Sequence, residues 1–120
     1  MTYFGTHGPS PKAEKPIKDK LHLGFVASLG CVLTGLMDVV VHHLLRAPSR
    51  HGQHKAGDQH TVALRKDLHI ALHDIWGDEA AFFTHHGVPE YLELANGIYA
   101  NSGDSVVCMQ LIAKARAPKE

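Results

Sequence analysis

The feature that most constrains the fold is an apolar run from Ile17 to about Arg46 that contains no proline. Its most hydrophobic part reads LHLGFVASLGCVLTGLMDVVVHHLL. Strands are usually about three to ten residues long, so a single strand cannot account for this run. The pattern therefore predicts one long helix over residues 17–46. Ala47 and Pro48 end it, because proline cannot continue a helix.

Four shorter helices are predicted after the long one, because residues that typically begin or end helices divide the remaining chain. The last of them starts with β-branched residues, which leaves a strand as its alternative. The predicted spans are Thr61–Trp76 ended by Gly77, Asp78–His86 ended by Gly87, residues 89–96 ended by Gly97, and Ser102 or Asp104 to Arg116.

These spans predict an all-α fold of about five helices in a single domain over residues 17–120. Residues 1–16 hold three of the six prolines and are predicted to be a flexible leader. The two cysteines, Cys31 and Cys108, lie inside apolar runs and read as buried, reduced thiols. The N-terminus lacks the features of a secretory signal, so we expect a cytoplasmic protein.

The predicted long helix has two different faces when its residues are projected at about 100° each. Large aliphatic side chains share one face, and small residues such as Gly24, Ala27 and Gly35 share the other. Small side chains let a second backbone approach closely. Residues 21–45 are therefore predicted to pair copies of the chain into a homo-oligomer, with a different protein partner as the alternative.

A membrane span is another interpretation of the same run. The uncharged part, Leu23–Met37, would rise only about 22 Å, short of the hydrocarbon core of about 30 Å. Extending it to Leu45 includes Asp38, which costs about 2.5–3.5 kcal/mol near mid-span. We therefore expect no membrane association, and a membrane-associated small subunit is the less favoured reading.

Histidines are the main candidates for chemistry, because nine of the eleven lie between His42 and His86. His69 and His73 are one helical turn apart, on the side of the predicted second helix that faces away from its apolar residues. Such a pair can bind a divalent metal. Asp38 and His42 have the same spacing on the predicted long helix. We predict that His69, His73, His42 and Asp38 bind a divalent transition metal, zinc or iron.

Two other interpretations of the histidines remain: one without a metal, and one in which a bound metal serves catalysis. Each one can simply be solvated or singly hydrogen-bonded, as in any histidine-rich protein. An enzyme would instead hold the metal in an open pocket lined by the same four side chains. The sequence contains no HExxH motif or other catalytic signature. We therefore favour a small non-catalytic protein that regulates or stores through metal binding.

Residues 77–115 resemble the repressor-type helix-turn-helix family. A short helix ends at Gly87-Val88, another starts at Pro89, and an asparagine-serine turn precedes a last helix that ends in LIAKA. The resemblance covers about a third of the chain. It implies a DNA-binding regulator, which is the alternative function from a different class.

This segment departs from the family pattern at several positions. His86 stands where the family buries an aliphatic residue, and Phe83 stands where it has alanine. The helix that would read DNA, PEYLELA, carries Glu90 and Glu93 and no basic residue, and carboxylates repel phosphates. Basic residues are concentrated elsewhere, because residues 1–66 carry nine Lys/Arg against four Asp/Glu, and residues 67–120 carry three against eight. We therefore expect no nucleic-acid partner.

Overall fold

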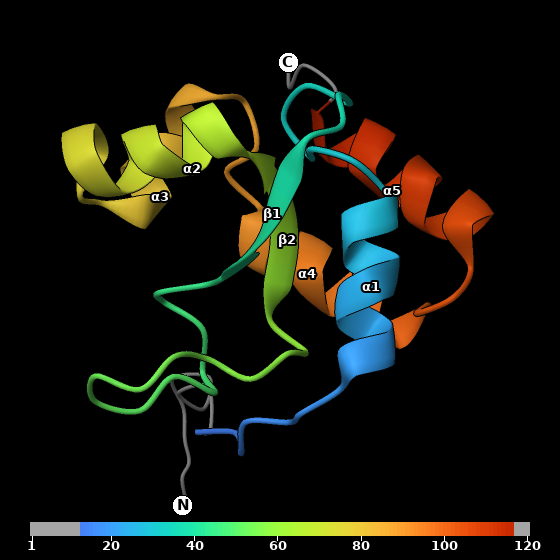
Figure 1. Cartoon of the computed structure of the whole chain (residues 1–120), viewed down its shortest axis with the longest axis horizontal. Helices are drawn as coiled ribbons and strands as arrows, with labels where there is room; N and C mark the ends of the chain where they lie inside the picture. The colour runs from blue at the N-terminus through green and yellow to red at the C-terminus, as the bar shows by residue number, and fades with distance from the viewer. Residues whose placement is uncertain (1–12, 117–120) are drawn as a thin grey trace, which may run out of the picture.

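The computed structural model describes residues 13–116 and shows a mixed α/β fold, so the all-α prediction is wrong (Figure 1). In this part of the chain, five α-helices and one π-helical turn surround a two-stranded antiparallel sheet. The elements are, in order, α1 (Lys20–Ser28), β1 (Val39–His43), β2 (Thr61–Arg65), α2 (Lys66–Ala71), the π-helical turn η1 (Leu72–Trp76), α3 (Glu79–His85), α4 (Tyr91–Ala100) and α5 (Ser105–Arg116).

The predicted long helix over residues 17–46 is wrong because the chain turns back after α1. Gly30 and Gly35 have φ angles of 82° and 77°, a region that glycine enters without steric cost. The Gly35 N–H donates to the Cys31 carbonyl at 2.8 Å and closes the turn. Three consecutive valines follow, Val39–Val41, and β-branched side chains favour the strand that they form.

The predicted second helix also begins too early. Its first five residues, Thr61–Arg65, form β2 instead and pair with β1, with Val41 opposite Ala63. Pairing with a strand some twenty residues earlier overrides the local helical pattern, because it buries both Thr61 and Val62. The helix ends as predicted, at Gly77 with a φ of 67°.

The three C-terminal helices lie close to their predicted positions. Asp78 caps α3, and the Asp104 carboxylate accepts a backbone N–H of α5, which is a helix and not a strand. Gly97 does not end α4, which continues to Ala100. A Cβ at Gly97 would lie 3.0 Å from Leu111 Cδ1, so this glycine allows α4 and α5 to pack closely.

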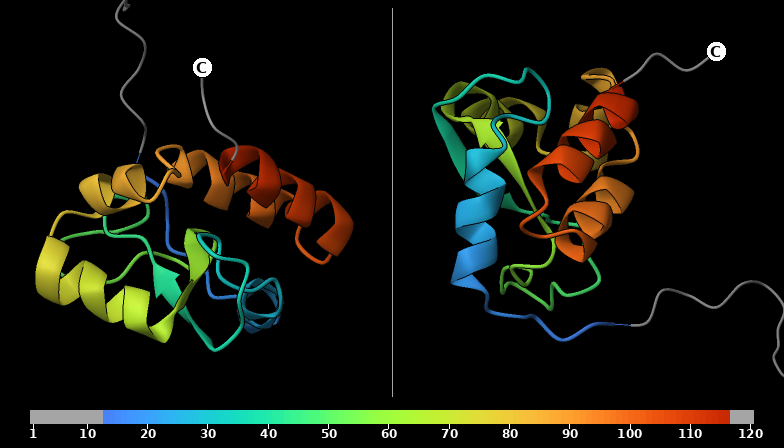
Figure 2. Two further views of the ribbon diagram at one scale, coloured as in Figure 1. Left: turned by 90° about the horizontal axis from the view of Figure 1, so that it is seen from above. Right: turned by 90° about the vertical axis from the view of Figure 1, so that its right-hand side faces the viewer.

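The helices cover the sheet from different sides (Figure 2). Helices α4 and α5 lie side by side along one side of the molecule, whereas α1, the sheet and α2 occupy the other. Among the described residues, no helix has the length and apolarity needed to cross a bilayer. The largest completely buried apolar side chains belong to Phe82, Phe83, Leu44, Leu64, Leu72 and Ile98.

Residues 13–19, the N-terminal strap, lie in extended conformation against the loop of residues 44–60. The Glu14 N–H donates to the Pro48 carbonyl, and the Asp58 N–H donates to the Ile17 carbonyl at 2.7 Å. The flexible leader predicted for residues 1–16 falls largely outside the described residues. Within them, residues 13–16 are hydrogen-bonded to the loop.

Two histidines are buried in this framework and hydrogen-bonded to serines. His22 Nδ1 lies 2.7 Å from Ser102 Oγ, and His60 Nδ1 lies 2.6 Å from Ser49 Oγ. Both residues are 1% exposed. Burial lowers the pKa of His22 and of His60, because the positive charge is poorly solvated there.

We expect the free energy of unfolding to fall as the pH drops below 6.5, the ordinary histidine pKa. The lowered pKa values of His22 and His60 mean that, below this pH, the unfolded chain binds more protons than the folded chain. The stabilisation is complete above pH 6.5 and is lost toward the lowered values. Urea denaturation across this range measures it, and the exposed-loop variant His54→Ala should show the same slope. A free energy that is constant or rises on acidification would contradict the expectation.

Candidate metal centre

Three histidines from two separate parts of the chain meet where the helical segment after β2 passes beside β1. His42 lies near the end of β1, His69 is in α2 and His73 is in η1. Strand β2 runs directly into α2 at Lys66, so the pairing of β1 with β2 carries the helix over the strand that holds His42. We call His42, His69 and His73 the histidine triad.

The ligating nitrogens of the triad all lie within 4.8 Å of one another. His69 Nε2 and His73 Nε2 are 3.2 Å apart. Two nitrogens on one tetrahedral zinc, each at about 2.0–2.1 Å, would be separated by about 3.3 Å. The helical pair already has this spacing, and a ring nitrogen of His42 lies within 4.8 Å of both.

The buried carboxylate of Glu79, at the start of α3, fixes His42. Its Oε1 lies 2.8 Å from His42 Nε2 and accepts the Leu45 N–H at 2.7 Å, while its Oε2 accepts the Arg46 N–H at 3.1 Å. Because Nε2 is engaged with Glu79, Nδ1 is the nitrogen of His42 that remains for a metal. A carboxylate behind a ligating histidine is a common arrangement in metal sites, since it fixes the orientation of the ring.

The electrostatics of the site favour a charged carboxylate and a neutral ligand. Burial acts to raise the pKa of Glu79, but the hydrogen bonds from His42 and from two backbone amides outweigh it, and the pKa is lowered. The pKa of His69 is lowered by burial and by the neighbouring His42 and His73. Metals bind neutral imidazole, so a lowered pKa keeps His69 ready to ligate.

Asp38 does not join the triad. Its predicted place beside His42 depended on helical spacing, but four residues along a strand span about 13 Å. Asp38 instead adopts a φ of 68° at the start of the strand, and its exposed carboxylate lies 3.4 Å from Lys66 Nζ. The structure therefore brings together three of the four predicted ligands, and Glu79 is a functional candidate that the sequence did not single out.

His73 lies in the π-helical turn η1, directly after the helix that carries His69. The Gly77 N–H donates to the Leu72 carbonyl at 2.9 Å, across five residues instead of four. Such wide turns are uncommon and often lie at functional sites. Here the turn contains His73, one of the three candidate ligands.

The neighbouring His43 points to the opposite face of β1 and has a structural role. Its Nε2 lies 2.8 Å from Asp58 Oδ1, and Asp58 Oδ2 accepts the Asp19 N–H at 2.7 Å. Burial acts to raise the pKa of Asp58, but these two hydrogen bonds lower it overall. His43 thereby connects the strand to the N-terminal strap and not to the triad.

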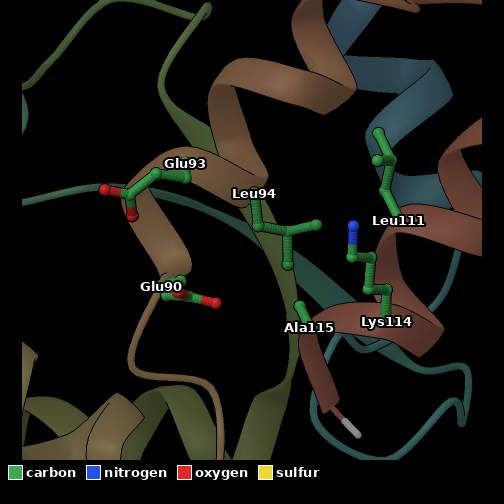
Figure 3. A pocket seen from close by; sticks show the side chains of 6 residues that line it. All are labelled: Glu90, Glu93, Leu94, Leu111, Lys114 and Ala115. Carbon is green, nitrogen blue, oxygen red and sulfur yellow. The ribbon is translucent and has the colours of Figure 1, made fainter.

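A shallow hollow of about 140 Å³ lies between α4 and α5, and the triad does not border it (Figure 3). Leu94, Leu111 and Ala115 provide apolar surface, with Lys114 on one side and Glu90 and Glu93 on the other. The two glutamates belong to the segment that resembles a DNA-reading helix. Their negative charge at this surface gives no support to phosphate binding.

Comparisons of this chain with protein-family models, with curated proteins and with solved structures find no match. The functional argument therefore rests on the geometry of the histidine triad and of the residues that hold it.

Proposed function

We propose that this protein binds a divalent transition metal through His42, His69 and His73 and acts as a metal-dependent binding or regulatory protein. The convergence of three imidazoles from β1, α2 and η1 within 4.8 Å carries the proposal. Glu79 supports it, because it orients the ring of the one ligand that is fully buried.

The donor set favours zinc, with iron(II) as the second choice. Imidazole suits zinc, copper, iron and nickel, whereas magnesium and calcium prefer oxygen ligands. Three histidines are a known zinc-binding set. An iron site would more often include a carboxylate among its ligands, and both oxygens of Glu79 already accept hydrogen bonds from other groups.

The hydrogen bonds made by Glu79 also favour binding over catalysis. A metal-dependent hydrolase usually places a free carboxylate or histidine beside the metal as general base. Glu79 accepts three hydrogen bonds and is 1% exposed, and Asp38 faces Lys66. Within residues 13–116, neither acidic group is placed to take a proton from a bound molecule.

Self-association through residues 21–45 and a cytoplasmic location are part of the proposal. The long helix that suggested self-association does not form, but Leu36 and Met37 in this range are more than half exposed. Exposed apolar side chains of this size suit a protein contact. Cys31 and Cys108 are free thiols, as expected in a reducing compartment.

Zinc should stabilise the metal-stripped protein, and His69→Ala should abolish most of this effect. At a free zinc concentration about one hundred times Kd, binding adds about 2.7 kcal/mol to the free energy of unfolding. Calorimetric titration measures the affinity, and thermal unfolding with and without zinc measures the stabilisation. Both should be done on protein without a histidine tag.

His54→Ala is the matched control, because His54 is exposed in the loop and is not part of the triad. This variant should bind zinc like the parent protein. Equal losses of affinity in His54→Ala and His69→Ala would show that zinc binds to scattered surface histidines. Absence of zinc binding by the parent would refute the proposed function directly.

A further inference from the structure

The triad offers fewer ligands than a closed metal site requires. Structural zinc is almost always bound by four protein side chains, whereas sites with three leave a position for water or another molecule. Among residues 13–116, the cluster consists of His42, His69 and His73 without a fourth histidine, cysteine or carboxylate. The nearest acidic side chain in contact with the triad, Glu79, is occupied by hydrogen bonds to His42, Leu45 and Arg46.

The triad is also open on one side. His42 is 3% exposed and forms its inner end, His69 is half-buried, and His73 is exposed at its outer end. Ile70 and Ile75, on the same helical segment, are 59% and 78% exposed, and their side chains carry no ligating atom. A metal bound here would therefore have protein on the His42 side and solvent on the His73 side.

We infer that the metal in this site keeps an exchangeable coordination position facing solvent, which holds water and accepts small monodentate anions. The inference rests on the proposed function and adds the class of ligand. Its physical reason is that a metal with three imidazole ligands keeps a net positive charge. Within residues 13–116, the exposed His73 side is open to a fourth donor.

Cobalt(II) added to the metal-free protein provides a test with two separate measurements. Cobalt bound to the triad should give visible absorption bands typical of low coordination number, and titration with azide should then shift these bands with a saturable dependence. His69→Ala should give neither response. His54→Ala should give both, because its triad is intact.

The outcomes separate the two proposals. If no cobalt bands appear in the parent protein, the metal site itself is refuted, and the inference with it. If the bands appear but azide leaves them unchanged, the proposed function stands and the open position is refuted. Light scattering with cobalt identifies one cause of the second result, since a dimer formed on cobalt addition would mean that a second copy closes the position.

Discussion

Replacing Glu79 by alanine should lower the free energy of unfolding by about 3 kcal/mol or more, because three donors lose their shared buried acceptor at about 1–3 kcal/mol each. The substitution removes the shared acceptor of His42 and of the N–H groups of Leu45 and Arg46, at a side chain that is 1% exposed. Chemical denaturation followed by circular dichroism measures the loss. Glu93→Ala removes an exposed glutamate and should change stability by no more than about 0.5 kcal/mol.

Glu79→Gln separates folding from metal binding. The amide keeps the shape of the side chain and one acceptor oxygen, so the fold should survive with a smaller loss. Zinc affinity should fall by about 10- to 100-fold, as is typical when the partner of a ligating histidine is changed. Unchanged zinc affinity in a folded Glu79→Gln protein would mean that the carboxylate has only a structural role.

Gly57→Ala should be the most damaging single-methyl substitution in the loop of residues 44–60. A Cβ at this position would contact Gln59 Oε1 and Ile17 N and would lie 2.6 Å from Pro16 Cα. Two of these contacts are to backbone, so the N-terminal strap must move away. We expect a loss of about 1–3 kcal/mol from overpacking alone, and more from the hydrogen bonds that the strap gives up.

Gly24→Ala is the matched control for that substitution. Gly24 lies inside α1, and a Cβ there meets nothing within 4 Å. Alanine is the better helix former, so this variant should gain about 0.5–1 kcal/mol. If Gly57→Ala and Gly24→Ala unfold at the same urea concentration, the strap is not held in the way described.

The predictability of the fold differs between the two halves of the chain. Helices α3 and α5 could be predicted because Asp78 and Asp104 are local capping residues, and caps act within one turn. The strands could not be predicted from their neighbouring residues alone. The apolar run is equally compatible with a long helix and with a helix, a turn and a strand, and the choice depends on the pairing of Val39–His43 with Thr61–Arg65.

The candidate site shows the same limit. His69 and His73 were predicted as a pair because their i, i+4 spacing falls within one continuous helical segment. His42 was included on helical spacing to Asp38 that the structure contradicts, and β1 pairing is what brings it near. Glu79 had no sequence pattern to mark it, because its importance comes from burial against β1 from a distant part of the chain. Metal binding itself stays a prediction.

The His42-His43 doublet makes β1 a junction between two distant regions. Neighbouring residues of a strand face opposite sides. His42 therefore contacts Glu79 of α3, whereas His43 contacts Asp58, which in turn accepts the Asp19 N–H of the strap. Epistasis is the consequence. The register of β1 must satisfy both the Glu79 contact and the Asp58 contact. Substitutions near Glu79 and near Asp58 are therefore expected to have non-additive effects, although these two carboxylates are not in contact with each other.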